Sequence, residues 1–496
     1  MEKVVRPLAS LYAYKIVQAY FAKTARGNKL YGISLAFIIG VGGWLAACQQ
    51  TAPPATTRPM QNTVAPIIIE VTRVITQTIV VTPAPPSSVC QPSNLSSANE
   101  VVLGALLPFS KPGAMQKGFA MQTAFTIAVE DINARGGIHG KPVRLITYDD
   151  SGDPVRAVGL AERLLREDCA AMLVGVYHSE VARAVKEVVH QYGVPIIFSE
   201  PHVDDLTADQ YPEVFRIGPT SMMYAQMPGK WLAKVGDYNG DETNLAVIVG
   251  ENSPHGVEQA KATQGWLLEY GFTGESVLVD LPSTNFSSVI ARIVALDKLP
   301  DAIFIQVAGE TAFDLQRQIL GAGLTPQKGT LIVSNAMILN DQRYWQQVPN
   351  GVYTVATQIG PWPSTVTALG KQFAIAYQQY FERWPERYAF GAYDAVQLAA
   401  DAINRAGTLD PAAIITALET ADIELASGHY QFPYNSKNPP DGDKVPAYLW
   451  HQWLNPQLLY LQYSEANQAG TEAAVIWPET YRTIDGPLLA TLFDDQ

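Results

Sequence analysis

Short apolar runs alternate with amphipathic segments along the chain from residue 101 onward. Uninterrupted apolar runs predict strands buried on both faces, whereas apolar residues at helical spacing predict helices that pack on one side. The first predicted strands cover residues 101–107, 143–148, 171–175 and 194–199, with helices at 117–133, 154–166 and 179–192. This order predicts a parallel sheet with helices on both faces.

The same alternation starts again further along the chain. Predicted strands cover residues 245–250, 277–280, 302–307 and 330–333, with helices at 257–270, 286–296 and 311–320, and two more helices follow at 369–381 and 392–406. Because a second strand–helix series forms a sheet of its own, the sequence predicts an α/β protein with two lobes, each wound the same way.

The first hundred residues do not follow this alternation. A basic cluster ends at Lys29, an uncharged apolar run covers residues 30–47, and the tripeptide Leu-Ala-Ala precedes Cys48. These features are typical of a secretory signal. They resemble the bacterial lipoprotein signal, which implies that residues 1–48 form a signal cleaved before Cys48 and that this cysteine is lipidated. An uncleaved membrane-spanning helix is the alternative. Residues 49–100 are rich in Thr and Pro and are expected to form a tether.

Composition and charge narrow the class of protein. Of 496 residues, 47% are apolar and 16% are charged, which is typical of a folded protein with a large core. The net charge of −13 argues against nucleic-acid binding, which needs a basic surface. The three cysteines form no CxxC motif of the kind found in zinc or thioredoxin-like sites. In an exported chain we expect Cys90 and Cys169 to form a disulfide, with two free thiols as the alternative.

Four short motifs carry a resemblance to a known family. They are residues 130–140 (EDINARGGIHG), 148–154 (YDDSGDP), 214–217 (VFRI) and 391–396 (GAYDAV). Their order and spacing resemble type I periplasmic binding proteins, in particular the branched-chain amino-acid (Leu/Ile/Val)-binding group of ABC transporters. Taken by itself, the first motif is a helix end followed by glycine turns. The aspartate pair of the second motif favours a turn or cap over a catalytic pair.

The resemblance implies both an architecture and a function. The family fold has two α/β lobes joined by three crossovers, which places lobe 1 at 101–219 plus 358–432 and lobe 2 at 220–357 plus 433–496. The ligand is expected between the lobes, at the carboxyl ends of the strands. The implied function is that of an extracytoplasmic, lipid-anchored solute-binding protein that delivers its ligand to the permease subunits of an ABC importer. A ligand-sensing receptor module of the same fold is the alternative.

Tyr177, His178 and Ser179 join a predicted strand to a predicted helix. The first turn of a helix presents unpaired N–H groups, which bind a carboxylate without needing a lysine. In the resembled family a serine at this place binds the ligand's carboxylate, and Ser179 matches that serine. The alternative role for Ser179 is to cap the helix.

Further loops match ligand contacts of the family. His202 and Val203 stand where the family has a small residue and a threonine, and His255 stands where it often has a tyrosine. Glu310 lies in another contact loop of the family. The resemblance therefore implies that these residues take part in ligand binding.

The ammonium partner of an amino-acid ligand is missing from its usual place. In the family this carboxylate lies near the position of Asn335, where the sequence has no acid. A buried ammonium needs a carboxylate, because its desolvation is otherwise too costly. Either Glu310 or Glu200 takes this role, or the ligand is not an α-amino acid. The expected ligand is therefore an amino acid, an amide or a small carboxylate.

Neither a metal site nor an enzyme is expected. His178, His202 and His255 would give the pocket a polar, pH-sensitive character, but histidines on such distant loops are a weak metal signal, and surface histidines are the alternative. The sequence contains no GxSxG, HExxH, P-loop or GxGxxG motif. No catalytic residue and no cofactor is therefore predicted.

Replacing Cys48 tests the predicted anchor. Wild-type protein should carry a diacylglyceryl group on Cys48, and Cys48→Ala should give unprocessed or soluble protein because the lipid has no thiol to attach to. Mass spectrometry of the membrane fraction measures both outcomes. An unmodified Cys48 within an uncleaved N-terminus would contradict the prediction.

Overall fold

The computed structural model describes residues 90, 98–307, 311–335 and 343–488. The predicted signal with Cys48, most of the predicted tether, and Glu310 lie outside the described residues. None of the helices in this part of the chain combines the length and the hydropathy that a membrane crossing requires.

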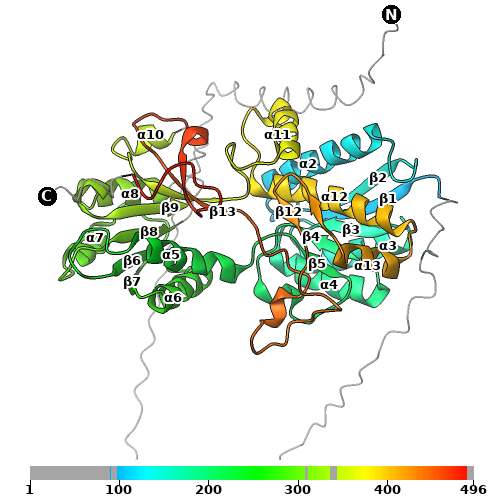
Figure 1. Ribbon diagram of the computed structural model, residues 1–496, viewed down its shortest axis with the longest axis horizontal. Helices are drawn as coiled ribbons and strands as arrows, with labels where there is room; N and C mark the ends of the chain where they lie inside the picture. Colours follow the sequence, from blue (N-terminus) through cyan, green and yellow to red (C-terminus); the bar gives the residue numbers. More distant parts are fainter. Residues whose placement is uncertain (1–89, 91–97, 308–310, 336–342, 489–496) are drawn as a thin grey trace, which may run out of the picture. The chain divides into compact units, whose positions relative to one another are not determined.

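The first sheet has five parallel strands (Figure 1). They are β1 (Val101–Leu107), β2 (Val143–Asp149), β3 (Met172–Gly175), β4 (Ile196–Phe198) and β5 (Val214–Arg216). Their order is β2-β1-β3-β4-β5. The carboxyl ends of all five strands therefore lie along one edge of the sheet, which is where such sheets bind ligands.

Helices cover both faces of this sheet. One face packs against α2 (Met115–Ala134) and α12 (Arg387–Ala406), together with α11 (Ala368–Phe381) and α13 (Pro411–Glu419). The other face packs against α3 (Pro154–Arg166) and α4 (Ser179–Tyr192). A short antiparallel pair, β11 (Ile423–Glu424) and β12 (His429–Tyr430), follows α13. Alternate β1 residues enter the two cores, as Leu103 and Leu106 illustrate.

The second sheet has seven strands in the order β14-β13-β10-β9-β8-β6-β7. They are β6 (Leu245–Glu251), β7 (Thr273–Val279), β8 (Ala302–Gln306), β9 (Leu331–Asn335), β10 (Val355–Ile359), β13 (Leu458–Gln462) and β14 (Ala474–Trp477). The five parallel strands β6–β10 repeat the strand order of the first sheet, which confirms the predicted common winding. Strands β13 and β14 are antiparallel additions that the sequence did not predict.

The helices of the second sheet also lie on both faces. One face packs against α5 (Ser221–Val235) and α6 (Pro254–Glu269). The other packs against α7 (Ser287–Val294), α8 (Thr311–Gly321) and α10 (Tyr344–Gln347). Trp362, which follows β10, is fully buried in the core between the second sheet and α7, α8 and α10, so its role is in packing.

Two of the sequence motifs are scaffold. At the end of α2, the Asn133 side chain donates to the Val143 carbonyl at 2.9 Å and accepts from the Val143 N–H at 2.7 Å, which fixes the start of β2. In α12, the buried Asp394 carboxylate accepts hydrogen bonds from the N–H groups of Ala426 and Ser427, both at 2.8 Å. These bonds attach the segment after α13 to α12.

Arg216, from the third motif, is a fully buried guanidinium at the end of β5. It donates to the Val203 carbonyl at 2.5 Å, to the Thr207 hydroxyl at 3.1 Å and to the Tyr448 carbonyl at 3.2 Å. It also donates to the side chain of Gln452. Burial lowers the pKa of Arg216 to about 10, so the group remains charged at neutral pH.

Three segments connect the two sheets, after β5, after β10 and before β13. The predicted lobe boundaries stay predictions, with one adjustment. Residues 433–453 were assigned to lobe 2, but the Arg216 N–H donates to the His451 carbonyl, and the Trp453 N–H donates to the Arg216 carbonyl, both at 2.9 Å. Residues 451–453 therefore extend the edge of the first sheet, and the chain returns to the second sheet after Trp453.

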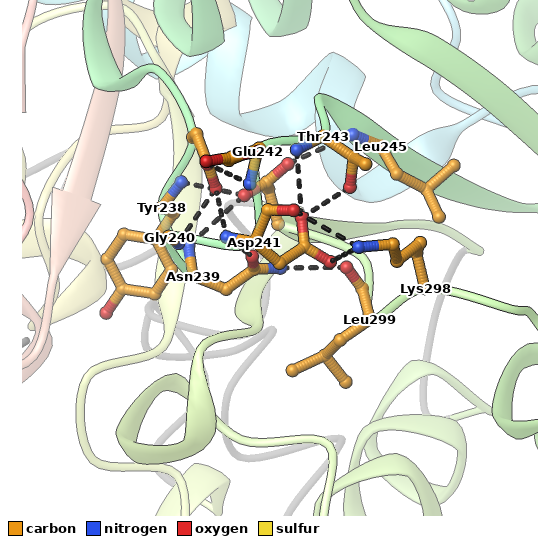
Figure 2. Close-up of polar contacts among 11 residues, drawn as sticks. Tyr238, Asn239, Gly240, Asp241, Glu242, Thr243, Leu245, Lys298 and Leu299 are labelled. Carbon is orange, nitrogen blue, oxygen red and sulfur yellow. Dashed lines mark hydrogen bonds and ion pairs between the residues drawn. The ribbon is translucent and has the colours of Figure 1, made fainter.

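A closed acidic turn joins α5 to β6 (Figure 2). Asp237 accepts from the N–H groups of Gly240 and Glu242 at 2.8 and 2.7 Å. The buried Asp301 accepts from the N–H groups of Tyr238 and Leu245 at 2.7 and 3.0 Å. Because Leu245 starts β6 and Asp301 immediately precedes β8, this turn supports the amino edge of the second sheet, opposite its strand carboxyl ends.

Cys90 and Cys169 form a disulfide in the structure, with Cα atoms 5.4 Å apart. Cys169 lies between α3 and β3, at the amino edge of the first sheet. The bond therefore attaches the chain at residue 90 to the outer end of the first sheet.

We expect neither thiol to react with an alkylating reagent in unfolded, non-reduced protein. A cross-link over 79 residues restricts the unfolded chain, so Cys90→Ser with Cys169→Ser should lower the free energy of unfolding by up to about 4 kcal/mol. Intact-mass analysis and urea unfolding measure the two effects. Alkylation of both thiols without reductant would contradict the bond.

Candidate functional site

The loops after β1, β2 and β3 meet at the carboxyl edge of the first sheet. The Asp149 carboxylate, at the end of β2, accepts from the Phe109 N–H at 2.7 Å and from the Ser110 hydroxyl at 2.6 Å. It also accepts from the Ser151 N–H at 3.0 Å, so this aspartate holds turns together, as the sequence predicted. His178 joins the same group, because its Nε2 accepts from the Ala114 N–H at 3.2 Å.

The loop between β3 and α4 provides no side-chain cap for the first turn of α4. His178 occupies the N-cap position with no side-chain capping bond, so the capping role considered for Ser179 does not apply. Ser179 is the first residue of α4, and its hydroxyl has no hydrogen-bond partner among the described residues. Burial lowers the pKa of His178, which favours the neutral ring. The first turn of α4 can therefore receive an anion.

A buried ion pair lies after β4. The Glu200 carboxylate is 5% exposed, and Arg387, the first residue of α12, donates to it at 2.6 Å. Arg387 also donates to His202 Nε2 at 2.9 Å and lies 3.5 Å from the Tyr224 hydroxyl. Burial raises the pKa of Glu200 to about 7, although Arg387 and then Lys117 oppose this shift.

Lys117 lies beside this pair, in the first turn of α2. Its ammonium is 4.7 Å from the centre of the Tyr388 ring, and Tyr388 packs edge-on against Tyr177 at 6.0 Å. Tyr177 in turn contacts His178 edge-on at 5.0 Å. Lys117, Arg387 and the open end of α4 therefore belong to one continuous group of side chains.

A cavity of about 330 Å³ adjoins the carboxyl ends of the second sheet. Its lining comes from five strands, β6, β8, β9, β10 and β13, and from the first halves of α5 and α6. It comprises Tyr224, Met227, Pro228, Glu251, Gly256, Gln259, Phe304, Ile305, Gln306, Val307, Val333, Ser334, Thr357, Ile359 and Tyr460. Tyr224 is shared, because it lines this cavity and also contacts Arg387 and His202. The candidate site thus consists of a cavity on one sheet, lined by both apolar and polar residues, and a polar, charged wall from the other sheet.

The predicted site residues have different positions in the structure. Tyr177, His178, Ser179 and His202 lie at the carboxyl edge of the first sheet. Val203 lies on the same loop, but its side chain packs against the core and only its carbonyl meets Arg216. The backbone of His255 lies at the start of α6, next to a cavity-lining residue.

Sequence reasoning missed three residues of the site, namely Lys117, Tyr224 and Arg387. One signal was present: Lys117 and Arg387 are cations in the first turn of a helix, where the helix dipole disfavours positive charge. Within the described part of the chain, no group of three or more His, Cys, Asp or Glu side chains is placed to hold a metal ion.

Comparisons with known proteins agree with this architecture. A family described as "Periplasmic binding protein" matches residues 100–441. The Leu/Ile/Val-binding protein homolog 7 of Brucella abortus is 27% identical over 385 residues, which covers 73% of this chain and 90% of that protein.

Two solved structures show the same fold with different ligands. A branched-chain amino acid transporter substrate-binding protein of Streptococcus pneumoniae, in complex with isoleucine, matches with a TM-score of 0.56 and 20% identity, covering 76% of this chain and all of that one. A solute-binding protein of an ABC transporter from Rhodopseudomonas palustris, in complex with dihydroxybenzoic acid, also has a TM-score of 0.56, with 19% identity, 74% of this chain and 93% of that one. Similarity of the overall fold therefore does not indicate which ligand this chain binds.

Glu200→Gln tests the electrostatics of the charged wall. The pKa of Glu200 is about 7 in the folded protein and 4.5 ordinarily, so the protonated carboxyl stabilises the folded state. This stabilisation is complete below pH 4.5 and is lost as the pH rises through 7. Urea unfolding from pH 5 to 8 should show wild-type stability falling by on the order of 3 kcal/mol more than that of the variant.

Glu180→Gln is the matched control, because Glu180 is an exposed glutamate on α4. The free energy of unfolding of this variant should change with pH as that of the wild type does. Parallel profiles for wild type and Glu200→Gln would contradict the raised pKa.

Proposed function

Because the chain belongs to the periplasmic binding protein family, we propose that it is the extracytoplasmic solute-binding protein of an ABC importer. It binds a small ligand between its two lobes and delivers the ligand to permease subunits. The observation that carries this proposal is the pairing of a cavity on one sheet with a polar wall on the other, joined through Tyr224. Relatives named as amino-acid-binding proteins and ABC transporter components support the same class.

The proposed anchor and lobes complete this picture. Lipid on Cys48 would hold the protein at the membrane surface, next to the permease. Lobe 1 comprises residues 101–219 and 358–453, and lobe 2 comprises 220–357 and 454–496, after the adjustment described above. The three connections between the lobes are the hinge about which the lobes close on the ligand.

A binding role is favoured over catalysis. The polar groups at the carboxyl edge of lobe 1 are mostly engaged with one another: Arg387 holds Glu200 and His202, and His178 accepts from Ala114. The groups without a partner include the first turn of α4 with the Ser179 hydroxyl, and the buried Asp150 Oδ2 and Ser199 hydroxyl. The N–H groups of a helix start hold an anion, and among the described residues no base is hydrogen-bonded to the Ser179 hydroxyl to activate it as a nucleophile.

The ligand binds through its carboxylate at α4. The described residues also limit the choice of an ammonium partner, because Glu200, considered for that role from the sequence, already pairs with Arg387 at 2.6 Å. An α-amino acid would therefore depend on a carboxylate other than Glu200.

Ser179→Ala should weaken ligand binding by roughly 1.5–3 kcal/mol, because it removes one hydrogen bond to a charged group. A thermal-shift screen of amino acids, amides and small carboxylates identifies the ligand, and calorimetry measures the loss. His202→Ala and His255→Ala, on opposite lobes, should weaken the same ligand.

Ser287→Ala is the matched control, since Ser287 is likewise the first residue of a helix, α7, but is exposed and does not line the cavity. It should bind as the wild type does. If Ser179→Ala binds normally but melts at a lower temperature, α4 does not hold the ligand. If no solute shifts the melting temperature, the proposed function itself is contradicted.

A further inference from the structure

A second, smaller cavity lies where the three connections between the sheets meet lobe 1. Its volume is about 30 Å³. Residues 217–219 from the first connection, residues 360–361 from the second, and Pro456 and Gln457 from the third all contribute to its lining. Every connection between the two sheets therefore borders this one space, which we call the hinge cavity.

Two neighbouring residues of lobe 1 bring unused hydrogen-bonding groups to the hinge cavity. Ser199 is 4% exposed, and its hydroxyl has no hydrogen-bond partner among the described residues. Glu200 is also buried, and only one of its carboxylate oxygens accepts a hydrogen bond, from Arg387 at 2.6 Å. Its other oxygen accepts none from the part of the chain that the structure describes. Burying such groups without partners is costly, so both favour an additional partner.

The first connection adds a donor to the same space. Gly218 is buried and lines the hinge cavity, and its N–H has no acceptor within residues 98–307, 311–335 and 343–488. Its carbonyl, in contrast, accepts from the Gln452 side chain at 2.9 Å. A hydroxyl, a carboxylate oxygen and a backbone N–H therefore border one cavity and offer both donors and acceptors.

Close packing of the backbone prevents side chains from covering these groups. A Cβ atom at Gly218 would lie 2.9 Å from the Ser199 carbonyl oxygen, and one at Gly391 would lie 3.0 Å from the same oxygen. Both glycines line the hinge cavity. Side chains are thus excluded at these two positions, and the polar groups between them depend on a small molecule from the solvent.

Size and chemistry together identify that molecule. A volume of about 30 Å³ equals the space that one water molecule occupies in the liquid. Buried waters typically make about three hydrogen bonds to groups that are otherwise unsatisfied. We propose that the hinge cavity is a binding site for one ordered water, which bonds to the Ser199 hydroxyl, the second Glu200 oxygen and the Gly218 N–H.

This water connects parts of the molecule that the proposed closure moves against each other. It bridges lobe 1, through Ser199 and Glu200, to the first connection at Gly218. Through Glu200 it also supports the charged wall, because the same carboxylate holds Arg387. The site goes beyond the proposed function, and its test does not depend on which solute the protein binds.

A crystal structure of the wild-type protein that resolves ordered solvent should show one water within hydrogen-bond distance of Ser199 Oγ and a Glu200 oxygen. In solution, oxygen-17 relaxation dispersion counts internal waters with long residence times. Ser199→Val should lower this count by one, because its methyl groups fill the cavity and form no hydrogen bond. Ser199→Ala should keep the water, since Glu200 and Gly218 still bind it.

Thr330→Val is the matched control. Thr330 is also fully buried, and its hydroxyl also lacks a partner among the described residues, but it does not line the hinge cavity. Its variant should therefore give the wild-type count. The melting temperature of each variant reports folding separately.

Two results would overturn the inference. One is a wild-type crystal structure with ordered solvent elsewhere but no water in the hinge cavity. The other is an unchanged count of internal waters in a folded Ser199→Val variant. If that variant does not fold, the wild-type structure alone decides. Neither result bears on the proposed binding of a solute, which the thermal-shift screen tests separately.

Discussion

The buried guanidinium of Arg216 organises the parts of the molecule on which the site depends. It holds the loop after β4 through the Val203 carbonyl and the Thr207 hydroxyl, and this loop carries Glu200 and His202. It also binds the returning chain at Tyr448, next to the start of the third connection between the sheets. Because a buried charge is stable only when its donors are satisfied, these segments cannot shift independently. The third sequence motif thus has a physical role, because one side chain fixes both the loop of the charged wall and the chain that leads into the third connection.

The sequence predicted the repeating parts of the fold well and the exceptional parts poorly. Helices α3 and α4 were predicted with their observed bounds, because each has a clear apolar face and recognisable ends, such as the left-handed Gly193 after α4. Helix α5 was missed, since Pro228 and its neighbouring glycine interrupt the helical signal. Strands β13 and β14 were missed because antiparallel additions at the end of a chain lack the strand–helix alternation that identified the others.

The site, like the fold, was predicted in part. Loops at strand ends could be predicted, because parallel strands place their carboxyl ends at one edge. The pairing of Glu200 with Arg387 joins residues 187 positions apart, and no local pattern encodes such a contact. What the sequence did contain was a local conflict, with Lys117 and Arg387 in helix first turns where positive charge is disfavoured. Conflicts of this kind tend to mark functional positions, where binding takes precedence over stability.

The disulfide between Cys90 and Cys169 has a mechanical consequence. It attaches the chain at residue 90 to the amino edge of the first sheet, at the end opposite the strand carboxyl ends. A pull on the chain before residue 90 is therefore transmitted through the covalent bond into the rigid sheet and reaches neither the three connections nor the cavity. Under the proposed lipid anchor on Cys48, lobe 1 would be the tethered lobe, and lobe 2 would be the one that moves when the two lobes close.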